Sequence, residues 1–278
     1  MTTLTPAPRR PSGGPHTGGP ASLRRIMAVS ERNLAVLRPM HYLAYLAGFA
    51  EPLLYLTSIG VGVGALIGQR VALPGGQLVP YPEFVAPAMV AASAMNGALS
   101  ESMFSFFSKL KHVRLYDSVL STPVRPIELA LGELLWALVR GVLYSAAFLA
   151  AMAAFGLVTP LRAVLALPAA ALVGFTFGAI GMAATAFMRS WADFDLLAAI
   201  PFALFLFSGT FAPVSGYPAP VRLALEATPL YHGTELIRAL CLGGADPGRL
   251  VWDVGYLVAA GALGIWLAGR RMRRLLTA

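Results

Sequence analysis

Apolar residues of the chain are gathered into six long stretches that are separated by shorter polar segments. The stretches cover approximately residues 42–67, 84–107, 129–155, 163–188, 196–212 and 250–268. About 20 helical residues cross the hydrocarbon core of a bilayer, so most of these stretches are long enough to span it with some tilt. The fifth is the shortest and contains Pro201 and Gly209, so we expect it to be bent or incomplete. The pattern predicts an all-α integral membrane protein with six transmembrane helices.

Two segments precede the first apolar stretch. Residues 1–21 are rich in proline, glycine and threonine and show no helical period, which is typical of a disordered cytoplasmic tail. In residues 22–38, apolar side chains recur at roughly helical spacing and arginines form a cationic side. This pattern predicts an amphipathic helix lying on the membrane surface, with an ordinary solvated helix as the alternative. We expect residues 39–278 to form the six-span domain.

The composition and the placement of the charges support a membrane protein. Hydrophobic residues make up 57% of the 278 residues and charged residues 12%, against about 25% charged in soluble domains. The net charge of +8 does not indicate nucleic-acid binding, because the basic residues flank apolar stretches and form no stripe with aromatics. With both termini inside, 15 of the 21 arginines and lysines fall in inner segments. This bias predicts that both termini lie in the cytoplasm. The excess of arginine over lysine and the abundance of alanine, glycine and proline indicate a GC-rich bacterial genome, so we expect a bacterial plasma-membrane protein.

Two longer segments lie between the stretches. Residues 108–128 form a polar inner loop with a short helical part that ends at Pro123. Residues 213–249 form an outer segment, in which the part 229–243 places apolar side chains on one face at Leu236, Ile237, Leu240 and Cys241. We expect a short external helix there, packed at the membrane surface or partly re-entrant, between spans five and six.

Ionisable residues inside the apolar stretches include Glu51, Glu101, Glu133 and Arg140, and a charge there is costly without a partner or a function. Glu51 precedes Pro52 and forms either a polar hinge facing the bundle or substrate route, or a hydrogen-bonded side chain that only fixes helix packing. Glu101 lies near the inner end of its span, where its side chain can snorkel to the interface. For Glu133 and Arg140 we expect structural bridges to neighbouring helices.

Several catalytic signatures are missing from the sequence. It has no G-x-x-x-x-G-K-[ST] phosphate-binding loop, no H-E-x-x-H metal motif and no G-x-S-x-G nucleophile turn. The G-x-G-x-G run that starts at Gly60 lies within an apolar stretch and not between a strand and a helix. We therefore predict no catalytic residue, metal or cofactor in this chain, and any ATP and Mg²⁺ would be bound by a partner protein.

Four stretches together resemble the membrane-spanning subunits of ABC-2 type transporters. They are AEPLLYL at 50–56, VAASAMNGALSE at 90–101, STPVRPIELALGELLWA at 121–137 and PLYHGTELIRALCLG at 229–243. The chain is most similar to the permeases of nodulation-factor (lipooligosaccharide) and daunorubicin-resistance exporters. This resemblance implies a permease that pairs with a second copy or a paralogous permease and with cytoplasmic ATPase subunits.

The resemblance also assigns roles to particular residues. The inner loop would contact the ATPase through Lys109, Lys111, His112, Arg114, Tyr116 and Asp117. The substrate path would include Glu51, Asn96, Ser208, Thr210 and Phe211. The external helix would contribute Tyr231, His232, Glu235 and Arg238 near the exit.

The resemblance further implies export of an amphipathic substrate, such as a lipid, a glycolipid or a hydrophobic drug. Two other classes stay open from the residues alone: a secondary transporter or channel without an ATPase, and a membrane-embedded enzyme. The first would be expected to show matched broken helices in two repeated halves, and no such match is visible between residues 42–155 and 163–268.

Overall fold

A computed structural model describes residues 24–25, 27–31, 54–58, 62, 70–73, 76–108, 126–188, 191–244 and 246–276. Most of these residues are helical. The main helices are α4 (Tyr81–Leu99), α6 (Pro126–Ala154), α7 (Pro160–Phe187), α8 (Trp191–Phe207), α9 (Ala219–Glu226), α10 (Pro229–Leu242) and α11 (Pro247–Leu276). A π-helix, η2 (Ser100–Ser105), continues α4, and a 3₁₀ turn, η4 (Val214–Gly216), precedes α9. A short antiparallel hairpin of β1 (Arg70–Ala72) and β2 (Leu78–Pro80), which the apolar pattern did not predict, pairs Val71 with Val79.

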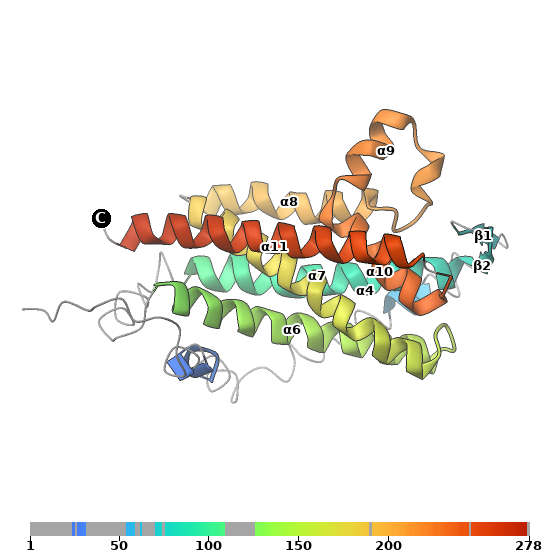
Figure 1. The fold of residues 1–278 in the computed structure, drawn as a ribbon, viewed down its shortest axis with the longest axis horizontal. Coiled ribbons are helices and arrows are strands. Elements are labelled where there is room, and N and C mark those ends of the chain that lie inside the picture. Colours follow the sequence, from blue (N-terminus) through green and yellow to red (C-terminus); the bar gives the residue numbers. More distant parts are fainter. Residues whose placement is uncertain are drawn as a thin grey trace, which may run out of the picture.

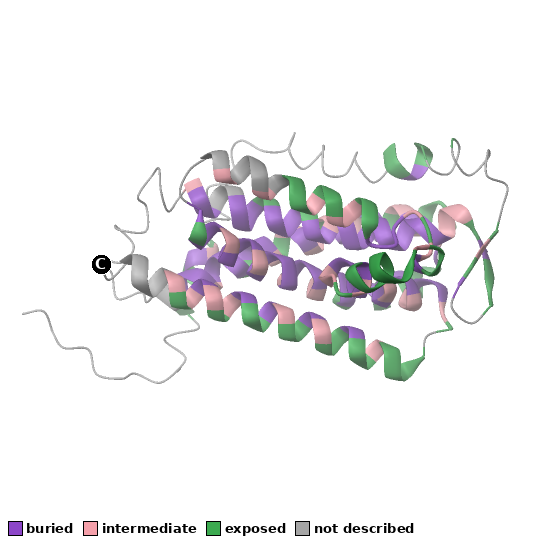
Figure 2. Cartoon of the chain, turned by 90° about the horizontal axis from the view of Figure 1, so that it is seen from above, coloured by how far each residue is buried: buried purple, intermediate pink, exposed green. Residues whose placement is uncertain are grey.

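The long helices α4, α6, α7, α8 and α11 run roughly along one axis, with α9, α10 and the β-hairpin at one end (Figure 1). We call this end the α10 end, and the opposite end, which holds the C-terminus, the C-terminal end. Helix α7 packs against α4, α6, α10 and α11. Figure 2 shows the buried residues concentrated through the middle of the bundle and the exposed ones along its outer helices.

Small residues allow the helices around α7 to approach closely. A Cβ atom at Gly178 would lie 2.8 Å from Cδ1 of Leu134 on α6. A Cβ atom at Gly264 of α11 would lie 2.8 Å from the backbone carbonyl carbon of Ala179 on α7. Gly178 and Gly264 therefore let neighbouring backbones come together, as small residues do between membrane helices.

Among the described residues, three helices are long and apolar enough to cross a membrane: Glu128–Ala154, Pro160–Phe187 and Pro247–Arg271. They correspond to the third, fourth and sixth predicted spans. Helix α4 with η2 corresponds to the second. Helix α8 corresponds to the fifth and is the short one expected, because the chain leaves the helix after Phe207 and Gly209 adopts a positive φ of 75°.

Large apolar side chains cover the outside of the bundle. Leu161, Val164, Val251 and Trp252 each expose two thirds or more of their surface, which would be costly in water and fits a lipid surround. The helical, multi-pass membrane fold is thus supported. The number of six spans stays a prediction, since most of stretch 42–67 lies outside the described residues.

Parts of the predicted organisation also fall outside the described residues. These are the tail 1–21, Glu51, and the inner-loop residues 109–125 with all six predicted ATPase contacts. Of the amphipathic segment 22–38, residues 24–25 and 27–31 are described and are helical. The extent of that helix and its position on a membrane stay predictions.

Candidate functional site

A cavity of about 200 Å³ lies between α4, α6 and α8, and Tyr55 of the first apolar stretch also lines it. We call it the aromatic cavity. Its lining residues are Tyr55, Met89, Ala92, Ser93, Asn96, Phe148, Pro201, Phe202 and Phe205. Aromatic rings and methionine make most of the wall, and one amide and two hydroxyl groups supply its polarity. Among the described residues, no charged side chain lines it. Such a wall suits an uncharged apolar group that carries a single polar substituent.

Helical spacing brings the polar and apolar wall residues together on α4. Met89, Ser93 and Asn96 recur at intervals of four and three residues, so they lie on one face. Asn96 is exposed, and Ser93 is half-buried one turn before it. On α8, Phe202 directly follows Pro201, and Phe205 lies three residues after Phe202. Both line the same cavity. The proline removes one backbone hydrogen bond at this level of α8.

The predicted substrate-path residues occupy different places. Asn96 lines the aromatic cavity. Phe211 packs edge-to-face on Phe205, with 5.2 Å between the ring centroids, and so supports the wall from behind. Ser208 and Thr210 are buried in the turn after α8, where their hydroxyl groups hydrogen-bond each other at 3.0 Å, and they do not line the cavity.

The aromatic wall residues Tyr55, Phe148, Phe202 and Phe205 were not predicted. The one sequence signal for two of them is the cluster of phenylalanines just after Pro201. Phe148 carries no such signal, because α6 is apolar on both its lipid-facing and its inward-facing sides.

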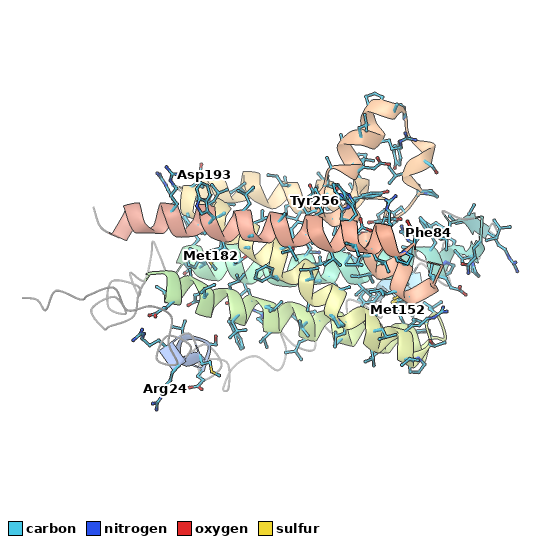
Figure 3. The ribbon with its side chains drawn as sticks, in the orientation of Figure 1. Arg24, Phe84, Met152, Met182, Asp193 and Tyr256 are labelled. Carbon is cyan, nitrogen blue, oxygen red and sulfur yellow. The ribbon has the colours of Figure 1, made fainter. Side chains whose placement is uncertain are left out.

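At the α10 end, the four predicted external-helix residues all make polar contacts, which we call the α10 network. Tyr231 and His232 of α10 contact Arg249, Asp253 and Tyr256 of α11, whereas Glu235 pairs with Arg238 within α10. Arg249 Nη2 donates to the hydroxyl oxygen of Tyr231 at 2.7 Å. In Figure 3, Tyr256 and Phe84 mark the part of the bundle in which this network lies.

Arg238 connects three elements at this end. Its Nη1 pairs with Glu235, its Nε donates to the carbonyl of Phe84 at 3.2 Å, and its Nη2 donates to the carbonyl of Gly209 at 2.9 Å. Its guanidinium also lies 4.0 Å from the centroid of the Phe84 ring. Burial lowers the pKa of Arg238, and the Glu235 carboxylate opposes that shift. The residue thereby fixes α10 to the start of α4 and to the turn after α8.

Another set of polar residues lies inside the bundle, where α4 continues into the π-helix η2. Glu101 of η2 is buried and pairs with Arg140 of α6, whose Nη2 donates to Tyr144 at 2.9 Å. The expected bridge from Arg140 to a neighbouring helix is confirmed. The expectation that Glu101 snorkels to the interface is wrong, because the arginine neutralises it inside the bundle. Glu133 is also buried.

Comparison with known proteins decides the family. Residues 69–270 match the sequence profile of the family described as ABC-2 family transporter protein. The chain belongs to the ABC-2 transporter family. The ABC-2 chain is 34% identical to Nodulation protein J of Rhizobium leguminosarum bv. trifolii, over 84% of this chain and 87% of that protein. It is 31% identical to Nodulation protein J of Sinorhizobium fredii, over 93% of this chain and 97% of that protein.

The resemblance found in the sequence is therefore confirmed, and the ABC-2 chain is a membrane component of a transporter. The predicted ATPase-contact residues lie outside the described part, but the end of their loop is described. There, Arg25 donates two hydrogen bonds of 2.9 Å to the carboxylate of Glu128, and Ser30 donates to the carbonyl of Gly132 at 2.9 Å. The N-terminal helical segment is thus attached to the first turns of α6.

Proposed function

We propose that this chain is the permease subunit of an ATP-driven exporter that moves an amphipathic substrate out of the cytoplasm or the inner leaflet of a bacterial plasma membrane. The observation that carries the proposal is the aromatic cavity inside an ABC-2 bundle, whose described wall residues carry no charge. A volume of about 200 Å³ is smaller than the roughly 300–1,000 Å³ of sites that enclose a whole drug-sized molecule. The cavity therefore suits one apolar portion of a longer substrate.

The bundle gives the substrate a route that avoids water. Phe202 and Phe205 approach Asn96 from the opposite helix, so an acyl chain or aromatic ring would pack between α4 and α8 while a polar group meets the Asn96 amide. Charged substrate portions would stay nearer the ends of the helices, because none of the described wall residues would compensate a charge buried in this cavity.

The directions of the described helices support the proposed topology. Helices α6 and α8 run toward the α10 end, and α7 and α11 run away from it (Figure 1). Arg270, near the end of α11, therefore lies at the C-terminal end with the end of α7 and the start of α8, and Arg24 lies toward the same end (Figure 3). We assign that end to the cytoplasm, in accordance with the positive-inside rule.

Energy would come from a separate cytoplasmic ATPase that binds ATP and Mg²⁺. The loop 108–128 would transmit its motion through Lys109, Lys111, His112, Arg114, Tyr116 and Asp117. The Arg25–Glu128 pair supports this route, because it joins the end of the loop to the N-terminal segment and to α6. A second copy or a paralogous permease would complete the transporter.

The test is to co-express the chain with the ATPase encoded beside its gene, to purify through a tag on the chain, and to measure ATP hydrolysis in nanodiscs. We expect the ATPase to co-purify and Arg114→Ala with Asp117→Ala to release it or to uncouple its activity. Arg222→Ala, at an exposed position of α9 at the α10 end, is the control and should leave both unchanged. A stable chain that retains no ATPase would contradict the proposal and favour a secondary transporter.

A further inference from the structure

A second cavity, of about 400 Å³, lies at the α10 end between the β-hairpin, α10 and the start of α11. We call it the α10 cavity. None of its lining residues lines the aromatic cavity. Its polar wall residues are Gln77, Glu235, Arg238, Asp246, Arg249 and Asp253. Its volume falls in the range of small-molecule sites, and the function proposed above assigns no role to it.

The charges of the α10 cavity differ from those of the rest of the chain. The whole chain carries a net charge of +8, whereas the cavity wall holds three carboxylates and two guanidinium groups. Both guanidinium groups already have partners. Arg238 bonds Glu235 and two carbonyl groups, and Arg249 bonds the Tyr231 hydroxyl at 2.7 Å. The wall therefore has an excess of hydrogen-bond acceptors and of negative charge.

Asp253 provides the sharpest indication of a ligand. Its side chain is 1% exposed. Its Oδ1 lies 2.7 Å from Nδ1 of His232, but its Oδ2 lies 4.0 Å from Nε of Arg249, which is beyond hydrogen-bond distance. Within the described residues no hydrogen bond reaches Oδ2. Asp253 lines the cavity and its Oδ2 has only this long ion pair with Arg249, so a ligand that brings hydrogen-bond donors would be stabilised here.

The other two carboxylates lie on different elements around the same space. Glu235, on α10, is 17% exposed and pairs through Oε1 with Arg238. Asp246, in the loop before α11, accepts from the backbone N–H of Gly248 at 3.3 Å. A cation in the cavity would thus meet carboxylates from three segments of the chain.

We propose that the α10 cavity binds a primary ammonium group. Such a group supplies three N–H donors and one positive charge, which match the acceptors and the excess of one carboxylate. A quaternary ammonium brings the charge without donors, and the described wall residues include no aromatic ring to receive it by a cation–π contact. A hydroxyl compound brings donors without charge, and an anion would be repelled.

An ammonium group at this site has two sources, the ethanolamine head of a lipid and a free soluble amine. The test uses the full chain without an ATPase, in nanodiscs of phosphatidylcholine alone, so its outcome does not depend on the proposed transport function. Binding of ethanolamine, choline and ethylene glycol is compared by ligand-observed NMR titration. We expect ethanolamine to bind at least about tenfold more tightly than the other two. Equal binding of choline or of ethylene glycol, or no binding of ethanolamine, would overturn the proposal.

Three variants locate the site. Asp253→Asn should weaken ethanolamine binding at least about tenfold, and Asp246→Asn, at an exposed position less prone to misfold, by roughly threefold. Glu226→Gln removes the same charge from the exposed helix α9 and should have no effect. Unchanged affinity in both aspartate variants would overturn the assignment.

Native mass spectrometry of nanodiscs that contain both phosphatidylethanolamine and phosphatidylcholine then separates the two sources of the ammonium group. Retained phosphatidylethanolamine indicates the lipid head, and exchange with free ethanolamine alone indicates a soluble amine.

Discussion

Nδ1 of His232 lies 2.7 Å from Oδ1 of Asp253, and this contact joins α10 to α11. Both side chains are buried, at 7% and 1% exposure. The His232 ring also stacks on Tyr256, with 4.0 Å between the centroids, and Tyr256 donates to the carbonyl of Ala227. Helix α10 is therefore fixed to α11 through these side chains.

The first prediction concerns this pair. Replacing His232 by alanine would leave the Asp253 carboxylate buried without its partner, which typically costs about 3–5 kcal/mol. We expect His232→Ala to lower the free energy of unfolding by roughly 3 kcal/mol, measured by thermal unfolding in detergent.

A surface pair gives the matched control. Arg222 and Glu226 of α9 lie 3.7 Å apart, and both are well exposed. Exposed pairs contribute about 0–1 kcal/mol, so Arg222→Ala should leave the unfolding temperature nearly unchanged. A similar loss in both variants would show that the buried pair has no special role.

The second prediction compares two glycines of α11. A Cβ atom at Gly264 would lie 2.8–3.0 Å from backbone atoms of Ala179 and Ile180, which cannot move aside as a side chain could. A Cβ atom at Gly255 would meet nothing within 4 Å. We expect Gly264→Ala to destabilise the protein by about 1–3 kcal/mol and Gly255→Ala to be neutral or slightly stabilising. The same thermal assay measures both, and equal unfolding temperatures would contradict the close contact of α11 with α7.

The third prediction uses Cys241, the single cysteine of the chain. Burial raises the pKa of its thiol to about 12 from an ordinary value of 9.0, against a smaller lowering by Arg162. A raised pKa keeps the thiol protonated, so at pH 8 its thiolate fraction is roughly a thousandfold below that of a free cysteine. Maleimide labelling should be negligible in the folded protein and rapid after denaturation. Fast labelling of the folded protein at pH 8 would contradict the burial of α10.

The fourth prediction concerns the aromatic cavity. Phe205→Ala removes a ring that lines it, whereas Phe207→Ala removes a half-exposed ring on the same helix outside it. In the reconstituted transporter we expect Phe205→Ala to weaken stimulation of ATP hydrolysis by an amphipathic substrate by about tenfold, because a lost buried aromatic contact is worth about 1–2 kcal/mol. Phe207→Ala should behave like the unmodified protein. The reverse order would move the substrate site away from this cavity.

Helix positions followed from the sequence with small errors. The predicted stretches 129–155 and 163–188 correspond to Pro126–Ala154 and Pro160–Phe187. Both helices begin at a proline, which suits the first helical position because that residue needs no N–H donor there. Helix α11 extends beyond the predicted 250–268 to Pro247–Leu276. Hydropathy detects only the part of a helix that lies in lipid, and the arginine-rich end continues the same helix outside it.

The candidate site was less predictable than the helices. The apolar face predicted for residues 229–243 is confirmed, since Leu236, Ile237 and Cys241 are buried. It could be predicted because α10 is amphipathic, so its sequence pattern shows which side packs against the bundle. Helices α7 and α8 are apolar all round, so the sequence does not show which side of them faces inward. The rotation of α8 brings Phe202 and Phe205 to Asn96, and only the three-dimensional structure reveals it.

The most direct test of the central proposal is ATP-dependent movement of a fluorescent acyl-chain lipid analogue in proteoliposomes that contain this chain and its ATPase. We predict that ATP moves the analogue from the leaflet on the ATPase side to the opposite leaflet, that an ATPase variant unable to hydrolyse ATP abolishes the movement, and that Phe205→Ala slows it. Movement at the same rate without ATP, or with the inactive ATPase, would contradict the account of an ATP-driven permease.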